Sequence, residues 1–471
     1  MRNLAKALAL GPLVGLILWS QVAWLAHMVS ASDSRAPSGG AAIAHHADGR
    51  RVDHEGRTPI VHQFRTGLAA AEPTIGFTRH GDLFFSAMES NTRIEVLRSG
   101  DKGRQWDIVS PRLDDETNAH LLSFDPYLYV DERTSRVFNV DLTVACSYLS
   151  YSDDRGESWA TNPLACGRPI NDHQTLFAGR PVNSNTVDYS NVVYYCWNDV
   201  GTSSCSKSLD GGESFAPTGA PAFVGVNPSG EGQTGPFCGG VTGHGSADTR
   251  GTIYLPKAHC EQPWLAISDD EGTTWSQVQV ADIGTYRYGS DPSVAVDKRG
   301  TIYYLWIAHD RLPYLTVSSD RGQSWSRPMM VGAPGLTEAD LPSLDVGKPG
   351  HIALAYYGSR NSPFRGCEGS PTCEPDLDYS DAAWSGYVSV STDALSPNPL
   401  FLTGTVNDRR DPLVRGACGP GRCSAVYDFI DVEIAPDGTA WAAYVDAWIG
   451  PHSSRIPAEG IVGRVVGTSL R

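Results

Sequence analysis

Residues 318–325 read Ser-Ser-Asp-Arg-Gly-Gln-Ser-Trp and follow the pattern Ser-x-Asp-x-Gly-x-(Thr/Ser)-(Trp/Phe). Similar turns recur along the chain. Five clear copies begin at Ser99, Ser152, Ser208, Ser268 and Ser318, and a decayed sixth copy is Ser391-Thr392-Asp393. The first serines lie 53, 56, 60, 50 and 73 residues apart. A nearly constant period of this length indicates a solenoid, a repeat array or a propeller.

The motif has a physical basis in a tight turn. Its carboxylate and hydroxyl accept hydrogen bonds from backbone N–H groups, and its glycine allows a backbone conformation that a side chain would oppose. The closing aromatic residue can pack between neighbouring sheets. With five such copies the chain resembles the Asp-box β-propellers of the sialidase type over about residues 58–471. The resemblance implies an all-β propeller with these aspartates at its rim, away from the centre.

A second repeat unit predicts the number of blades. Its clearest form, residues 291–303, reads as an apolar strand, an Asp-x-x-Gly turn and a second strand. Six relatives align on the turn glycine and begin at Glu72, Asp125, Asp172, Thr242, Leu341 and Phe429. Seven units against six turn motifs favour a seven-bladed propeller, with six blades as the alternative.

The last unit lacks an outer strand, although it has strand-like stretches at residues 440–444 and 460–466. Residues 60–64, Ile-Val-His-Gln-Phe, can supply that strand from the other end of the chain. We therefore expect residues 60–64 to pair with residues 460–466. Such closure joins the ring and leaves no open sheet edge around it.

The first 57 residues precede the repeats. An apolar run from Ala7 to Val29 follows Arg2 and Lys6, so residues 1–31 are expected to be a signal peptide or a membrane anchor helix. In both cases the propeller is extracytoplasmic: periplasmic or at the cell surface, or secreted if the segment is cleaved. Residues 32–57 are rich in Ser, Gly, Ala and His and indicate a flexible tether.

Cysteine spacing agrees with export. Ten cysteines fall as sequence neighbours, which suggests five local disulfides, although sequence alone leaves the connectivity open. The suggested pairs are Cys146/Cys166, Cys196/Cys205, Cys238/Cys260, Cys367/Cys373 and Cys418/Cys423. None has the Cys-x-x-Cys spacing of a metal site.

Two insertions break the period, at residues 361–381 and 407–427, and each holds a cysteine pair. The first also holds an acidic run that could bind calcium, but the run lacks the spacing of a known calcium loop. A solvated loop is the better interpretation, so no cofactor is expected.

The formal net charge of −16 argues against nucleic acid and against anionic lipid as partners. The expected partner is a glycan or a protein, with membrane contact through the N-terminal segment if that segment is uncleaved.

The inner strands of a propeller converge on its axis, so the first residue of each unit should face one mouth of the axial channel. Four of these seven residues are acidic, and two histidines lie beside them. The candidate binding residues are Glu72, Asp125, Asp172, His173, His244 and Asp291. Carboxylates drawn together repel, which raises their pKa values or recruits a cation, a sugar or ordered water. The alternative is that an Asp before Pro simply caps the start of a strand.

The resemblance to sialidases implies three arginines that bind the substrate carboxylate, a Tyr–Glu nucleophile and an acid/base Asp. The stretch that matches the first arginine motif is residues 70–73, where Ala71 holds the arginine position. Residues 85–89 contain no Asp for the acid/base role. Arg455 belongs to the last blade and Arg65 follows the closing strand, so no arginine triad emerges.

These observations predict an exported, membrane-tethered and non-catalytic propeller that binds a glycan or a protein, for example as a subunit of a larger membrane complex. A second hypothesis is a glycoside hydrolase that uses paired carboxylates such as Asp125 and Asp291 on a neutral glycan. A third is a true sialidase with displaced arginines.

Overall fold

The computed structural model of the chain describes residues 42–47, 49–53, 60–90, 93–112, 123, 125–143, 147–164, 171–199, 202–225, 240–285, 291–364, 378–416, 426, 428–448 and 456–471. Every regular element bounded in these ranges is a β-strand, and all of them belong to one compact unit, residues 35–471. Within the same ranges no helix is long and apolar enough to cross a bilayer. The expected signal peptide or anchor at residues 1–31 lies outside the described residues.

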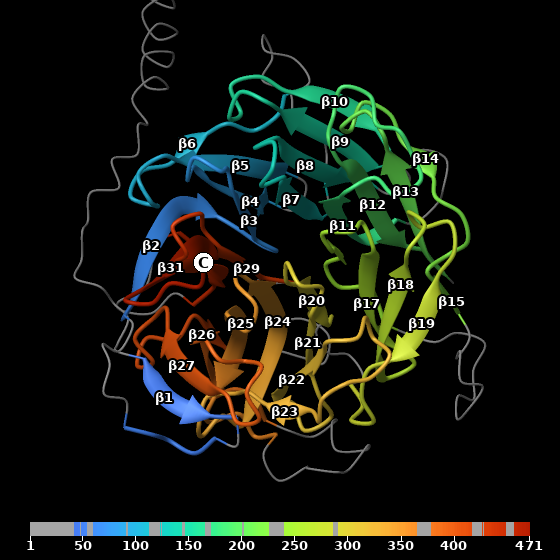
Figure 1. Cartoon of the computed structure of the whole chain (residues 1–471). Coiled ribbons are helices and arrows are strands. Elements are labelled where there is room, and N and C mark those ends of the chain that lie inside the picture. The colour runs from blue at the N-terminus through green and yellow to red at the C-terminus, as the bar shows by residue number, and fades with distance from the viewer. Residues whose placement is uncertain are drawn as a thin grey trace, which may run out of the picture. The chain divides into compact units, whose positions relative to one another are not determined.

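Seven antiparallel sheets, here called blades 1 to 7, follow one another around an axis (Figure 1). From the axis outward, blade 1 is β3 (Thr74–Phe77), β4 (Leu83–Ser90), β5 (Arg93–Ser99) and β6 (Asp107–Ile108). Blade 2 is β7 (Pro126–Val130), β8 (Val137–Leu142), β9 (Ser147–Ser152) and β10 (Ala160–Pro163). Blade 3 is β11 (Asp172–Gly179), β12 (Val192–Asn198), β13 (Thr202–Ser208), β14 (Ala216–Pro217) and β15 (Phe223–Val224).

Blade 4 is β16 (Ser246–Ala247), β17 (Ile253–His259), β18 (Gln262–Ser268) and β19 (Ser276–Gln279). Blade 5 is β20 (Ser293–Val296), β21 (Ile302–Ile307), β22 (Pro313–Ser318) and β23 (Met329–Met330). Blade 6 is β24 (Glu338–Val346), β25 (Ile352–Ser359), β26 (Ala383–Ser391), β27 (Leu400–Thr405), β28 (Val414–Arg415) and β1 (Ile43–His46). Blade 7 is β29 (Asp431–Ile434), β30 (Ala440–Asp446), β31 (Glu459–Val466) and β2 (Ile60–Ala69).

The ring closes as the sequence predicts. Strand β2 pairs antiparallel with β31, with Ile60 opposite Val466 and Phe64 opposite Val462. In Figure 1 the blue N-terminal strand lies beside the red C-terminal one. The inner strand β29 of blade 7 contacts the inner strand β3 of blade 1, so the seven inner strands form an unbroken circle. The seven-bladed propeller closed by an N-terminal strand is therefore confirmed.

The expectation of a flexible tether over residues 32–57 does not hold for Ile43–His46. These residues form β1, which pairs antiparallel with β27 and adds an outermost strand to blade 6. Residues 50–52 fold back on β1, with backbone hydrogen bonds from His46 to Arg50 and from Val52 to Ala44. The free edge of β27 provides the pairing partner that makes this segment ordered.

Large aromatic residues on the inner three strands of the blades fill the space between neighbouring sheets. The largest fully buried side chains are Trp306, Trp384, Trp441, Phe84 and the tyrosines at positions 194, 195, 254, 303, 304, 356, 357 and 444. Each such ring removes a large apolar area from water, and this burial is the main stabilising contribution of the blade interfaces.

The five clear turn motifs share one set of hydrogen bonds. In the copy at Ser318, the Ser318 hydroxyl donates to Asp320 Oδ1 at 2.8 Å and accepts from the Gly322 N–H at 2.8 Å. Asp320 Oδ1 also accepts from the Ser324 N–H at 2.8 Å. The glycine of every copy has a left-handed backbone, with φ +83° at Gly322. The decayed copy keeps only the first bond, from Ser391 to Asp393 at 3.0 Å.

Side chains also join the inner strands of adjacent blades. The Leu128 N–H donates to Thr74 Oγ1 of blade 1 at 2.8 Å, and the Leu344 N–H donates to Ser293 Oγ of blade 5 at 3.1 Å. At the closure, the Ile75 N–H donates to Asp431 Oδ2 of blade 7 at 3.0 Å. An inner strand has a free edge toward the axis, and a side chain from the preceding blade satisfies part of that edge.

One predicted disulfide is fully described. Cys196 and Cys205 are bonded, and they lie directly opposite each other on β12 and β13. Cys260 is also disulfide-bonded, to a cysteine outside the described residues. The other predicted partners, at positions 146, 166, 238, 367, 373, 418 and 423, lie outside the described residues.

Candidate functional site

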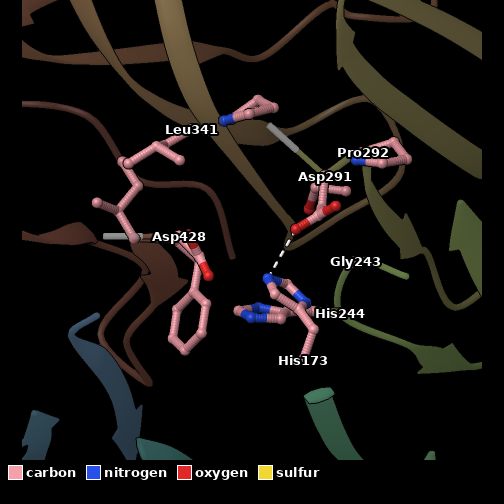
Figure 2. A pocket seen from close by; sticks show the side chains of 11 residues that line it. His173, Gly243, His244, Asp291, Pro292, Leu341 and Asp428 are labelled. Carbon is pink, nitrogen blue, oxygen red and sulfur yellow. Dashed lines mark ion pairs between the residues drawn. The ribbon is translucent and has the colours of Figure 1, made fainter. Parts of the chain in front are cut away.

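The starts of five inner strands converge on one pocket at the axis. Its described lining comes from blades 3 to 7 and consists of His173, Gly243, His244, Asp291, Pro292, Ser293, Leu341, Pro342, Asp428, Phe429 and Ile430. Figure 2 shows the two imidazoles side by side below Asp291, with Leu341 and Asp428 on the opposite wall. The pocket has a volume of about 280 Å³, including space that is open to solvent.

An ion pair crosses the pocket wall. His173 Nε2 lies 2.7 Å from Asp291 Oδ2, with a geometry outside that of a hydrogen bond, and His173 Nδ1 lies 2.8 Å from the Thr242 carbonyl oxygen. Burial alone would lower the pKa of His173. The Asp291 carboxylate outweighs burial and, with Asp125 and Asp428, raises this pKa to about 10. The imidazole is therefore a cation at neutral pH, fixed against a carboxylate.

Glu72 and Asp125 form a second pair next to the pocket. Their side chains are only 2% and 5% exposed. Burial, the Asp125 charge and a hydrogen bond with Asp125 raise the pKa of Glu72 well above its usual range, so Glu72 keeps a proton that it shares with Asp125. The Asp428 N–H donates to Glu72 Oε1 at 3.2 Å, and the His173 N–H donates to Asp125 Oδ2 at 3.3 Å. These bonds connect the second pair to the pocket.

Aromatic rings fill the centre beside the ion pair. Phe429 packs edge-on against His173 at 5.3 Å and against His244 at 5.4 Å, and His244 packs edge-on against Tyr127 at 4.8 Å. Burial and the neighbouring His173 cation lower the pKa of His244 to about 3. His244 is therefore neutral, and the axis is occupied by rings below a shallow mouth.

Several buried polar atoms at the mouth have no protein partner. They are Glu72 Oε2, Gln174 Oε1, His244 Nε2 and both side-chain polar atoms of Asn171. Buried polar groups in native proteins nearly always find a partner, often ordered water. These atoms are therefore available to water or to polar groups of a ligand.

Five of the six candidate residues predicted from sequence meet here: Glu72, Asp125, His173, His244 and Asp291. Asp172 does not join them. Its side chain is exposed, because His173 adopts a left-handed backbone (φ +48°) and β11 is irregular between Asp172 and Thr175. The carboxylate of Asp172 acts only from a distance, as one of the charges that raise the pKa of Asp291.

Sequence reasoning missed two charged residues of the site. Asp428 precedes an aligned position and lines the pocket. Lys257 lies within β17, where its Nζ donates to Ser203 Oγ at 2.9 Å. Burial lowers the pKa of Lys257 to about 8, against the opposing effect of Asp291 and Asp199. No local signal marks a lysine in mid-strand as part of a distant site.

The arginines considered for a sialidase site lie elsewhere. Arg65 forms ion pairs with Asp446 at 2.8 Å and with Glu459 at 2.6 Å, and both carboxylates are buried. Arg455 lies outside the described residues. Ala71 is buried, and its carbonyl accepts a backbone hydrogen bond from Met88. None of the residues that line the described pocket is an arginine.

Comparison with known proteins gives structural neighbours only. No family model and no curated protein matches the sequence. The Hadza microbial sialidase Hz136 is similar at a TM-score of 0.41 and 16% identity, covering 61% of this chain and 63% of its own. The GH74 xyloglucanase from Xanthomonas campestris is similar at 0.41 and 14% identity, covering 91% and 66%. The Aleuria aurantia lectin, solved with Fucα1-6GlcNAc, is similar at 0.40 and 11% identity, covering 70% and 97%. The chain thus spans about two thirds of the two enzymes.

Proposed function

We propose that this chain is a non-catalytic binding propeller of the Asp-box type, exported from the cytoplasm, which binds a glycan or a protein partner at its axial mouth. The carrying observation is the ring-filled axis: His173, His244, Phe429 and Tyr127 pack together and leave a shallow pocket with one carboxylate at its wall. A shallow mouth with fixed polar groups suits recognition of a ligand tip.

The most direct test is isothermal titration of the purified full-length chain against a panel of oligosaccharides. Saturable binding to a glycan, with no change in the glycan on prolonged incubation, is the expected result. Cleavage of any panel member would contradict the non-catalytic proposal.

Hydrolysis of a sialic acid glycoside should be undetectable. A sialidase clamps the substrate carboxylate with charge-assisted bonds, whereas this pocket presents Asp291 and Asp428 and no arginine among its described lining. The loss of such a clamp costs several kcal/mol, and each 1.4 kcal/mol is about a tenfold loss in rate. A fluorogenic sialoside assay measures this. Turnover that disappears in the variant Asp291→Asn would refute the binding-only proposal.

The glycoside hydrolase alternative keeps one supporting observation. Glu72 and Asp125 share a proton, and an ionisable pair of this kind can exchange protons with a substrate. Both side chains are buried behind the lining, however, and neither is among the residues that line the pocket. Reducing-end release from neutral polysaccharides by the parent chain, and its loss in Asp125→Asn, would favour the hydrolase.

Export and membrane tethering remain part of the proposal, because residues 1–31 carry the apolar run and Cys196–Cys205 is a disulfide of the kind found outside the reducing cytosol. Purification from native membranes tests both the tether and the protein-partner reading. Co-purification with a constant set of proteins would support a subunit of a membrane complex. Recovery from the cytosolic fraction would contradict the proposed location.

A further inference from the structure

We infer that the axial mouth recognises one uncharged sugar residue at the end of a glycan, through hydroxyl groups that donate hydrogen bonds to Asp291. This inference rests on the proposed binding function and names the ligand class of the same site. Four features of the pocket carry it: the orientation of Asp291, the apolar walls, the balance of charge and the size.

The Asp291 carboxylate is held so that one oxygen stays open. Its Oδ2 contacts His173 Nε2 at 2.7 Å, and the side chain is 12% exposed and lines the pocket. In the described part of the chain no other protein group is hydrogen-bonded to this carboxylate. His173 is in turn fixed by the Thr242 carbonyl and by Phe429. The open oxygen is therefore a rigid acceptor, and two adjacent sugar hydroxyls are the donors that such a group binds best.

The remaining walls are largely apolar. Leu341, Pro342, Pro292, Phe429 and Ile430 surround the acceptor with carbon atoms. A sugar ring presents the matching pattern, with hydroxyl groups at its edge and C–H groups on its face. A single carboxylate within an apolar pocket also gives orientation, because only one edge of the ring carries donors that can reach it.

Charge excludes an acidic sugar. The described lining holds two carboxylates, Asp291 and Asp428, against one cation, His173, which Asp291 already pairs. Lys257 is buried and is not part of the lining. A carboxylate or sulfate on the ligand would meet like charge without a free cation to bind it, which is unfavourable in a partly desolvated site.

Size favours the end of a chain. The volume of about 280 Å³, open space included, falls below the usual range of roughly 300–1,000 Å³ for ligand pockets. One ring can enter, and the rings that fill the axis leave no path for a chain to pass through. The bound residue must therefore be terminal.

The test is titration of the full-length chain with oligosaccharides that differ only in the terminal residue: neutral, amino, acidic or O-methylated. We expect binding of at least one neutral terminus and at least tenfold weaker binding of its acidic counterpart. O-methylation of the terminal hydroxyls should abolish binding, and this arm requires no protein variant. Asp291→Asn should weaken binding about 10- to 100-fold, as expected for a lost hydrogen bond to a charged group.

Asp172→Asn is the matched control, because it removes the same charge from the same ring at an exposed position, and it should bind as the parent does. Preference for an acidic, amino or internal residue, tolerance of O-methylation, or equal losses in Asp172→Asn and Asp291→Asn would each overturn the inference. Glycan binding that Asp291→Asn leaves unchanged would overturn the inference alone. Cleavage of the ligand would overturn the proposed binding function instead.

Discussion

The chain should become easier to unfold as the pH rises from about 5 to about 8. Burial raises the pKa of Asp141, Asp345 and Asp431 to about 7 and that of Asp446 to about 6. A carboxyl group whose pKa is higher in the folded state stabilises the fold at low pH, and this contribution is lost as the pH rises through the folded pKa.

His173 acts in the same direction above its ordinary value of 6.5, because its folded pKa is about 10. His244 acts in the opposite direction, but only between about pH 3 and its ordinary value. The aspartates of the turn motifs, such as Asp320 with a pKa lowered to about 2, also oppose the trend only at still lower pH. Together these groups predict a stability maximum in the mildly acidic range.

Asp141 offers the sharpest check, because it is 3% exposed and its partner is a neutral amide, Asn139, at 3.1 Å. A shift of about three pKa units corresponds to roughly 4 kcal/mol when the group must ionise, at about 1.4 kcal/mol per unit. Asp141→Asn should therefore gain about 2–4 kcal/mol at pH 8 relative to the parent and little at pH 5. Calorimetric melting across this pH range measures both effects.

The control for this prediction is Asp320→Asn at the exposed turn, which should leave the slope of Tm against pH between 5 and 8 unchanged. A parent Tm that stays level or increases from pH 5 to pH 8 would show that the buried carboxyls are not held protonated.

Loss of Glu271 should be the most damaging single change at a turn motif. Glu271 occupies the second x position of the fourth motif, with a left-handed backbone and no exposed surface. Its Oε1 accepts from three successive N–H groups of blade 3, those of Val182, Asn183 and Ser184, at 2.7–3.0 Å. Its Oε2 lies 2.6 Å from Lys207 Nζ. Burial would raise the pKa of Glu271, but these partners lower it to about 2.

Glu271→Ala should lower the free energy of unfolding by about 3–5 kcal/mol, because it leaves the Lys207 cation and three backbone donors without their acceptor. The matched control is Arg321→Ala, at the equivalent position of the fifth motif. Arg321 is 37% exposed on its side chain and pairs with Asp269, so its loss should cost less than about 1 kcal/mol. Urea unfolding of both variants measures the difference. Equal losses would mean that the position, and not the buried charge network, sets the stability.

The fold was predictable because its signals are local. Each turn motif holds its own hydrogen bonds within seven residues, as from Ser318 to Ser324, and so marks a blade without reference to the rest of the chain. Strand β1 carries no comparable signal, and its order depends on the edge of β27, more than 350 residues away along the chain.

The site was predictable to the extent that it follows the repeat. Alignment placed Glu72, Asp125 and Asp291 at the starts of units, and the structure brings them to the axis. Asp172 failed because the left-handed His173 and the adjacent irregularity of β11 reverse which side chain faces inward. Lys257 reaches the site only through packing between blades, which no spacing in the sequence encodes.

The pairing of β2 with β31 also sets an order of events during biosynthesis. Residues 60–69 leave the ribosome early, and their partner, residues 459–466, leaves it about 400 residues later. Until then β2 has no mate and blade 7 does not exist, so the nascent ring is a row of sheets with an open edge at each end. Joining so distant a pair is entropically costly and slow, and it comes last. Translation and export therefore share one deadline: the early strand must be kept from other partners until the final strand arrives.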